Sequence, residues 1–242
     1  MKLTFWGTSH GLPEKGRYCT CTMLEVGDNI YFIDAGAPLA DIMVNHDIPY
    51  ERVKAIFITH AHLDHSSGLP VFIGMQKWFK RDCDTGYYLP DEFLYNGLHP
   101  FFTDRPEESN TKIHPHVYQK GVFYDDGVIQ VEAIPTQHMS NINRLTYAFK
   151  VTAGDKSLIF TGDLSDEFQD FPEVASKENF DAVVCELTHF SIESAIPKLN
   201  AAKTKKMIFN HVRDDKIALL KESNDKLNFS YTITNDGDII EV

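Results

Sequence analysis

Long apolar runs are missing from this 242-residue sequence. No stretch approaches the roughly 18 residues that a membrane-spanning helix needs, and the first residues lack the apolar core and cleavage site of a signal peptide. Cysteine is scarce as well, and the four that occur do not form a dense disulfide framework. We therefore expect a cytoplasmic protein with reduced thiols and no membrane partner.

Basic residues are fewer than acidic residues in this sequence. Lys and Arg total 23 against 35 Asp and Glu, which gives a formal net charge of −12. Because phosphate contacts need a basic surface, this balance disfavours nucleic acid as a partner and favours a small-molecule substrate. Repeats, low-complexity tracts and linkers are absent too. The length suits one large α/β unit, so we expect a single domain over residues 1–242.

The most informative stretch of the chain is residues 59–68. Four side chains that can bind metal fall within six residues: His60, His62, Asp64 and His65. The apolar run 53–58 predicts a strand that leads into them, and 69–79 predicts a helix after a Ser-Ser-Gly turn. Imidazole together with carboxylate suits zinc, iron or manganese. A solvated charged loop is the plain alternative, but it does not account for such a group at the end of a buried strand.

Three further ligand-type side chains each follow an apolar strand-like run: His138, Asp163 and His211. Gly162 lets the backbone turn so that the carboxylate of Asp163 can project inward. Taken singly, each has an ordinary structural interpretation: His138 as a loop histidine, Asp163 as a turn aspartate and His211 as a helix-start histidine. Their shared position matters more, because α/β sheets gather their sites at the carboxyl ends of strands.

The order of the predicted elements indicates the architecture. Strand-like runs come in two batches, each followed by strand–helix alternation, which predicts two sheets packed face to face with helices outside. The aromatic-rich segment 90–115 is irregular, and we interpret it as a helical insertion or lid with a loop. The segments 229–233 and 238–242 predict a final hairpin.

With these residues in place, the sequence resembles the metallo-β-lactamase superfamily of hydrolases. Its pattern His-x-His-x-Asp-His, then His, Asp and His, is filled at every position. The resemblance implies an α/β fold, a four-layer αββα sandwich, and two divalent metal ions, with zinc preferred over manganese or iron. It assigns the first metal to His60, His62 and His138, and the second to Asp64, His65 and His211. It makes Asp163 the bridge and Asp34 the residue that orients a ligand histidine.

The opening residues 5–13, followed by Arg17, resemble the RNase Z branch and its phosphodiesterase relatives, as does Cys185-Glu186-Leu187-Thr188-His189. This resemblance makes His189 a proton donor to the leaving group, Glu186 the group that orients it, and His10 a residue of the pocket. A strand-end histidine that caps the next helix is the alternative for His189. RNase Z carries a long basic arm between the later His and Asp, whereas here they are 25 residues apart (163 − 138). Relatives on this branch are often homodimers.

Together these features predict a metal-dependent hydrolase, with Asp64 among its catalytic residues. A phosphodiesterase that cleaves a small phosphodiester by attack of a metal-bound hydroxide is preferred. A lactone or thioester hydrolase is the alternative that the ligand set does not separate. A di-iron oxidoreductase is more distant, because such proteins usually have Glu at the position of His62. A non-catalytic scaffold is also more distant, because such members tend to lose ligands.

Overall fold

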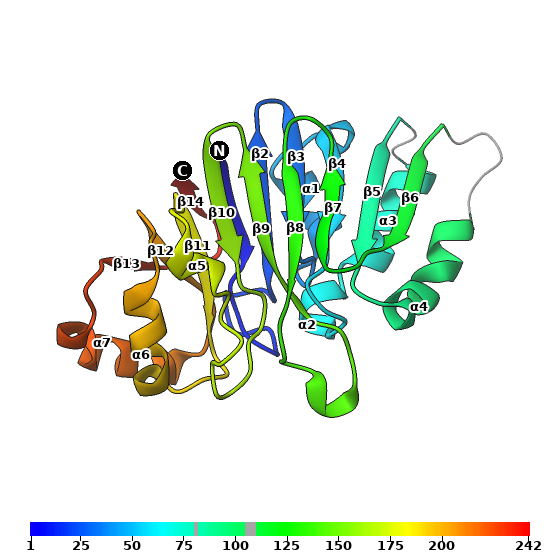
Figure 1. Ribbon diagram of the computed structural model, residues 1–242. Coiled ribbons are helices and arrows are strands. Elements are labelled where there is room, and N and C mark those ends of the chain that lie inside the picture. The colour runs from blue at the N-terminus through cyan, green and yellow to red at the C-terminus, as the bar shows by residue number, and fades with distance from the viewer. Residues whose placement is uncertain (80–81, 105–109) are drawn as a thin grey trace.

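Two seven-stranded sheets dominate the computed structural model, which describes residues 1–79, 82–104 and 110–242 (Figure 1). The first sheet has the order β14-β1-β2-β3-β4-β5-β6. Its strands are β1 (Lys2–Gly7), β2 (Cys21–Val26), β3 (Asn29–Ile33), β4 (Val53–Phe57), β5 (Asp84–Leu89), β6 (Lys112–Val117) and β14 (Asp238–Glu241). The second sheet has the order β13-β12-β11-β10-β9-β8-β7. Its strands are β7 (Gly121–Asp125), β8 (Gln130–Pro135), β9 (Tyr147–Ala153), β10 (Lys156–Phe160), β11 (Ala182–Leu187), β12 (Met207–Val212) and β13 (Tyr231–Ile233).

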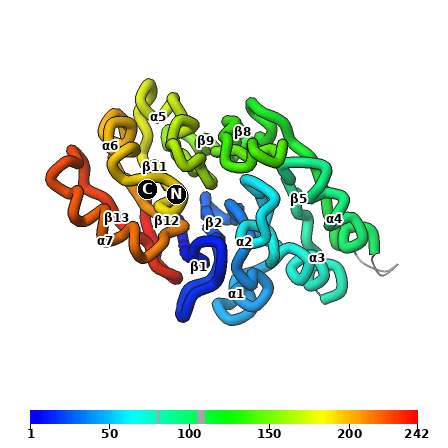
Figure 2. Tube along the Cα trace, turned by 90° about the horizontal axis from the view of Figure 1, so that it is seen from below, coloured from blue at the N-terminus to red at the C-terminus, as the bar shows by residue number. Residues whose placement is uncertain are grey.

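Helices cover the outer face of each sheet, as Figure 2 shows from below. The α-helices are α1 (Leu39–Asn45), α2 (Leu63–Ser66), α3 (Leu69–Trp78), α4 (Glu92–Thr103), α5 (Val174–Lys177), α6 (Ile192–Ala201) and α7 (Asp214–Glu222). Short 3₁₀ turns add η1 (Tyr50–Arg52), η2 (Ser140–Ile142) and η3 (Asn224–Lys226). Buried residues of α1, α3 and α4 pack on the first sheet, and those of α5, α6 and α7 pack on the second. The predicted αββα sandwich is therefore confirmed.

The central core lies between the two sheets. It joins inward-facing residues of both, with Phe57 of β4 and Phe149 of β9 at a ring-centroid distance of 6.3 Å. Strand β11 is buried along its whole length, as expected for a strand in a parallel region that is covered on both faces. This covering explains why its sequence is almost continuously apolar.

The parallel pairings decide where a site can form. Strands β3, β4 and β5 run parallel in the first sheet, and β10, β11 and β12 run parallel in the second. Their carboxyl ends meet along one edge of the sandwich, the lower edge in Figure 1, where α2 lies. This is the edge at which the sequence places the candidate ligands.

The predicted C-terminal hairpin is wrong. β13 pairs in parallel with β12, whereas β14 pairs antiparallel with β1 in the other sheet. The connection crosses between the sheets, with Thr234 N donating to Phe209 O and Gly237 N donating to Phe5 O. Two short alternating segments signal strands, but their spacing does not reveal which open sheet edge each one completes.

The segment 90–115 contains a helix and a strand. Asp91 caps α4 by accepting a hydrogen bond from Leu94 N at 3.0 Å, and buried Leu98 and Phe102 face the first sheet. The strand β6 was not predicted, because Pro115 interrupts it, although proline is tolerated in an edge strand. Residues 105–109 of this segment lie outside the described residues.

Two further expectations concern the cysteines and the membrane. All four cysteines are buried, and their reduced state stays a prediction. Among the described residues, no helix is both long enough and apolar enough to cross a bilayer.

The inter-sheet core generates a stability prediction. Phe149→Ala removes a fully buried ring that contacts both sheets, so we expect the free energy of unfolding to fall by about 3–5 kcal/mol. Phe79→Ala is the matched control, because Phe79 is 73% exposed and its loss should change stability by no more than about 0.5 kcal/mol. Urea unfolding of both variants measures the difference, and equal effects would contradict the assigned core.

Candidate metal centre

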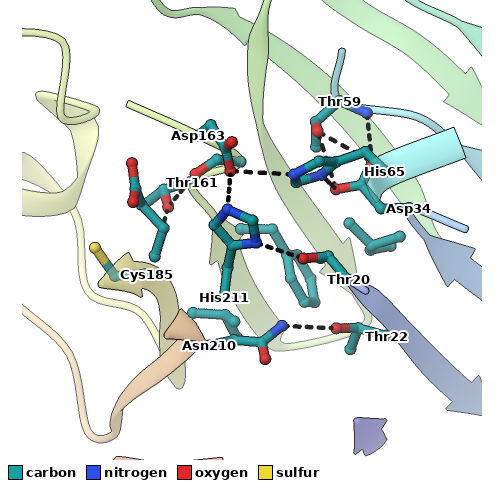
Figure 3. Close-up of a pocket in the computed structure, with 15 residues that line it drawn as sticks. Thr20, Thr22, Asp34, Thr59, His65, Thr161, Asp163, Cys185, Asn210 and His211 are labelled. Atoms are coloured by element: carbon teal, nitrogen blue, oxygen red, sulfur yellow. Dashed lines mark hydrogen bonds and ion pairs between the residues drawn. The ribbon is translucent and has the colours of Figure 1, made fainter. Parts of the chain in front are cut away.

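The histidine-rich loop leaves β4 and turns at once into α2. Asp34, at the end of β3, lies behind this loop and accepts hydrogen bonds from Thr59 N at 2.8 Å and from Thr59 Oγ1 at 2.9 Å (Figure 3). The next turn of the chain approaches so closely that a Cβ on Gly36 would lie 1.7 Å from the carbonyl oxygen of Asp64. Only glycine fits at this position, which explains why Gly36 follows Asp34 and Ala35.

The first donor cluster, here called cluster 1, consists of His60, His62, His138 and Asp163. His62 Nδ1 lies 3.0 Å from His60 Nε2 and 3.3 Å from His138 Nε2. Asp163 Oδ2 lies 3.6 Å from both Nε2 atoms. Bonds of 2.0–2.1 Å in a tetrahedral zinc site place neighbouring ligand atoms about 3.3 Å apart, so these distances fit one small cation.

Two rings of cluster 1, His60 and His138, are oriented by polar contacts of the nitrogen that faces away from the cluster. His138 Nδ1 donates to the carbonyl oxygen of Leu164 at 3.2 Å. His60 Nδ1 lies 3.1 Å from Thr59 Oγ1, which in turn donates to Asp34. A proton held on Nδ1 leaves the Nε2 lone pair free to bind metal. Both rings are therefore presented as ligands.

The second cluster, cluster 2, consists of Asp64, His65, Asp163 and His211. Asp163 Oδ1 lies 3.3 Å from His65 Nε2 and 3.4 Å from His211 Nε2. Figure 3 shows these two rings converging on the same carboxylate. Asp64 Oδ2 completes the group at 3.5 Å from His65 Nε2 and 3.9 Å from His211 Nε2.

Three atoms of cluster 2 are buried and have no hydrogen-bond partner: His65 Nε2, Asp163 Oδ1 and His211 Nε2. Buried polar atoms are rarely left unpaired, because each one costs desolvation energy. A divalent cation at their centre would satisfy all three at once. The residues present therefore fit a metal ion.

Three ligands of cluster 2, namely His65, His211 and Asp64, also form hydrogen bonds with groups outside the cluster. Asp34 Oδ2 accepts from His65 Nδ1 at 2.7 Å. Thr20 Oγ1 lies 2.6 Å from His211 Nδ1, and the backbone N–H of Gly11 donates to Asp64 Oδ2 at 2.9 Å. Neither Thr20 nor Gly11 was identified from the sequence, because a strand-flanking threonine and a loop amide carry no motif.

His211 stands in a β-bulge within β12, not after the strand as expected. The pairing with β11 passes from Glu186↔Asn210 to Leu187↔Val212 and leaves His211 as the extra residue, at a φ of 53°. Left-handed backbone is uncommon outside glycine and costs of the order of 1–3 kcal/mol. The bulge turns the imidazole toward Asp163. Gly162, at a φ of 57°, makes the corresponding turn before Asp163.

The charges of the cluster are strongly coupled. Burial alone would raise the pKa of Asp163, but His211, His65 and His60 outweigh it and hold this pKa well below its ordinary value. Burial would lower the pKa of His65, but Asp163 and Asp34 raise it well above the usual range. Burial, followed by the charge of His65, lowers the pKa of His60. A divalent cation binds the ionised carboxylate and neutral ring nitrogens, so metal binding at cluster 2 would displace the proton that Asp163 and Asp34 favour on His65.

Glu186 and His189 lie beside the two clusters. His189 Nδ1 is 2.9 Å from both carboxylate oxygens of Glu186, and its Nε2 is 3.8 Å from Asp163 Oδ2. Burial lowers the pKa of His189, but the hydrogen bond and charge of Glu186 and the charge of Asp163 raise it to about 9. Glu186 also accepts from Leu164 N at 2.7 Å, so it supports the residue that holds His138.

The structure thus brings together nearly all the residues that the sequence selected. The seven ligand candidates form the two clusters, Asp34 lies directly behind them, and Glu186 and His189 border them. His10 directly precedes Gly11, which donates to Asp64, and its Nε2 lies 3.6 Å from Glu14 Oε1 within its own loop. A role for His10 in the pocket stays a prediction.

Comparisons with known proteins identify the class. The metallo-β-lactamase fold protein YhfI from Bacillus subtilis matches with a TM-score of 0.80 and 17% identity, over 100% of this chain and 99% of that one. The short form of human tRNase Z matches with a TM-score of 0.76 and 18% identity, over 100% and 99% of the two chains. The fold and the two clusters therefore define a metallo-β-lactamase-fold protein, as the sequence predicted.

Within this class, the chain belongs to the family described as Anti-Pycsar protein Apyc1, whose family model matches residues 1–230. Ribonuclease Z from Shouchella clausii is 29% identical over 163 residues, which cover 64% of this chain and 49% of that protein. The chain thus spans about half the length of this curated relative. The predicted resemblance to the RNase Z branch is confirmed.

The two clusters generate a metal-binding prediction. Purified protein loaded with zinc should hold about two ions per chain, whereas Asp64→Ala and His138→Ala should each hold about one, because each removes a ligand of a single cluster. Metal analysis after gel filtration measures this. Two ions retained in both variants would contradict the division into clusters.

Proposed function

We propose that this protein is a binuclear metal-dependent phosphodiesterase that acts on a small phosphodiester. The proposal places one divalent cation in cluster 1 and one in cluster 2, with Asp163 between them. Zinc is preferred, because imidazole and carboxylate donors at these distances suit it, and manganese or iron are the alternatives. Two such cations would act as Lewis acids and lower the pKa of bound water.

The protein's own residues set the geometry of such a reaction. Asp163 directs Oδ2 toward cluster 1 and Oδ1 toward cluster 2, so one rigid carboxylate fixes the separation of the two positions. Asp163 is 2% exposed, and the rings packed around it exclude bulk water. Electrostatic interactions with a phosphate group are stronger in such an environment than in water.

The observation that carries the proposal is the Glu186–His189 pair beside the clusters. Glu186 fixes Nδ1 of His189 and accepts its proton in a hydrogen bond, so Nε2 is directed toward Asp163, the carboxylate that the two clusters share. The hydrogen bond and charge of Glu186 raise the pKa of this ring, and bound cations would lower it. A proton donor placed there suits a poor leaving group, such as the alkoxide of a phosphodiester.

Two features support a small substrate. The interval between His138 and Asp163 contains only η2 and the strands β9 and β10, which belong to the second sheet. Leu63, inside the metal loop, and Leu12, next to Gly11, are 76% and 74% exposed. An apolar rim and a net charge of −12 suit an organic monoanion better than a polyanion. The predicted homodimer and cytoplasmic location stay predictions.

The role of His189 predicts a dependence on the leaving group. His189→Ala should slow hydrolysis of a phosphodiester with an alkyl leaving group by about 10²–10⁴-fold. Bis(p-nitrophenyl) phosphate should be affected much less, because p-nitrophenolate leaves without a proton. Metal content should stay at the wild-type level. Equal losses for both esters, or a loss of metal, would contradict the assignment of His189 as a proton donor.

A substrate panel distinguishes the proposed activity from its alternatives. Zinc- and manganese-loaded protein should cleave bis(p-nitrophenyl) phosphate and small cyclic phosphodiesters, and should not cleave a lactone or a thioester probe. Cleavage of the carbonyl probe alone would establish the lactonase or thioesterase alternative. A short single-stranded RNA, added to the same panel, would be cleaved well only if the small-substrate part of the proposal is wrong.

A further inference from the structure

Two charged side chains outside the clusters bind the segments that carry the ligands. Asp170 lies in the loop after β10, and Arg17 lies in the loop after β1. Neither contacts a ligand side chain in the hydrogen bonds and ion pairs of the described residues. Both instead hold backbone groups one or two residues away from ligands. Asp170 lies beside cluster 1, and Arg17 lies beside cluster 2.

Asp170 joins the two loops of cluster 1. Its Oδ2 accepts from Gln137 N at 2.6 Å, and its Oδ1 accepts from Ser165 Oγ at 2.7 Å. Ser165 N also donates to the carboxylate at 3.1 Å. Gln137 directly precedes His138, and Ser165 follows Asp163 by two residues. A single carboxylate thus fixes the separation of two ligand-bearing loops.

Arg17 performs the corresponding task for cluster 2. Its Nη2 donates to the carbonyl oxygens of Thr8 at 2.7 Å and Val212 at 2.6 Å, and its Nη1 donates to Glu14 at 2.7 Å. Val212 directly follows His211 in the strained bulge, and its own N–H donates to Thr8 O at 3.0 Å. The planar fork of a guanidinium can span two carbonyl groups, which an ammonium group cannot do in the same way.

The loop that Arg17 closes also reaches a second ligand of cluster 2. Arg17 holds Thr8 and Glu14, the residues on either side of this part of the loop, and it exchanges backbone hydrogen bonds with Glu14 at 3.0 Å. Between them, Gly11 N donates to Asp64 Oδ2. Arg17 therefore supports His211 through Val212 and supports Asp64 through Gly11. The contacts of Arg17 do not adjoin His60, His62 or His138.

We propose that Asp170 and Arg17 are positioning residues that set the affinities of the two metal positions separately, Asp170 for cluster 1 and Arg17 for cluster 2. This proposal rests on the metal assignment of the proposed function. The clusters share Asp163, but each has its own histidines. Asp170 holds the backbone beside His138 of cluster 1, and Arg17 holds the backbone beside His211 of cluster 2. Loss of Asp170 or Arg17 would make the ligands of the corresponding cluster more mobile. Groups that orient ligands typically contribute about 10–100-fold to metal affinity.

The test measures zinc affinity in backgrounds that retain a single cluster. Asp64→Ala retains cluster 1, and His138→Ala retains cluster 2. Asp170→Asn and Arg17→Lys are introduced into both backgrounds, and zinc affinity is determined by competition with a chromophoric chelator. Asp170→Asn should weaken zinc binding about 10–100-fold in the Asp64→Ala background. It should weaken zinc binding much less in the His138→Ala background, where only its contact with Ser165, near the shared Asp163, bears on the remaining cluster. Arg17→Lys should show the reverse pattern.

Matched controls come from the opposite edge of the sandwich. Asp181, just before β11, accepts hydrogen bonds from Ser157 N at 3.0 Å and from Lys205 Nζ at 2.7 Å. Arg52, just before β4, donates to the carbonyl oxygens of Asp28 at 2.8 Å and Gly27 at 3.4 Å. Asp181→Asn and Arg52→Lys remove similar interactions far from the ligands. They should leave zinc affinity unchanged, whatever they do to the Tm of the metal-free protein.

Several outcomes would overturn the proposal. Equal weakening in both backgrounds, or weakening by the control variants, would reduce the two residues to general stabilisers of the fold. Unchanged affinity in every combination would show that they position nothing. Loss of all zinc binding in either single-cluster background would refute the independence of the two positions. Wild-type protein that binds no zinc would instead refute the metal assignment itself.

Discussion

The buried carboxylate of Asp163 is the group on which the rest of the site depends. It is 2% exposed, and its two oxygens face rings of different clusters: Oδ2 faces His60 and His138, and Oδ1 faces His65 and His211. A charge in such a position is costly unless it is paired. Two cations would pair it and would also provide the missing partners of the three buried atoms in cluster 2.

The sandwich fold stabilises this arrangement because both sheets contribute ligands to it. The first sheet supplies Asp34 and the histidine-rich loop, and the second supplies His138, Asp163 and His211 from the ends of β8, β10 and β12. Non-glycine residues at positive φ, including Asp34 and His211, occur in this layer. Such strain persists only where the surrounding packing fixes the backbone, and the core between the sheets lies directly behind it.

The sequence allows much of the centre to be predicted because its ligands lie in local patterns. His60 to His65 follow an apolar strand, and the later ligands stand at or near strand ends, so their convergence follows from parallel strands sharing an edge. What could not be predicted depends on long-range contacts. Four features involve partners that are far apart in the chain. They are the bulge at His211, the hydrogen bond from Gly11 to Asp64, the contact between Thr20 and His211, and the crossing from β13 to β14 between the sheets.

The most direct test of the binuclear centre is anomalous diffraction at the zinc absorption edge from crystals of the zinc-loaded protein. The account predicts two peaks about 3.5–4 Å apart, one within bonding distance of His60, His62 and His138, the other within bonding distance of His65 and His211, and both next to Asp163. A single peak, or peaks away from Asp163, would contradict the account.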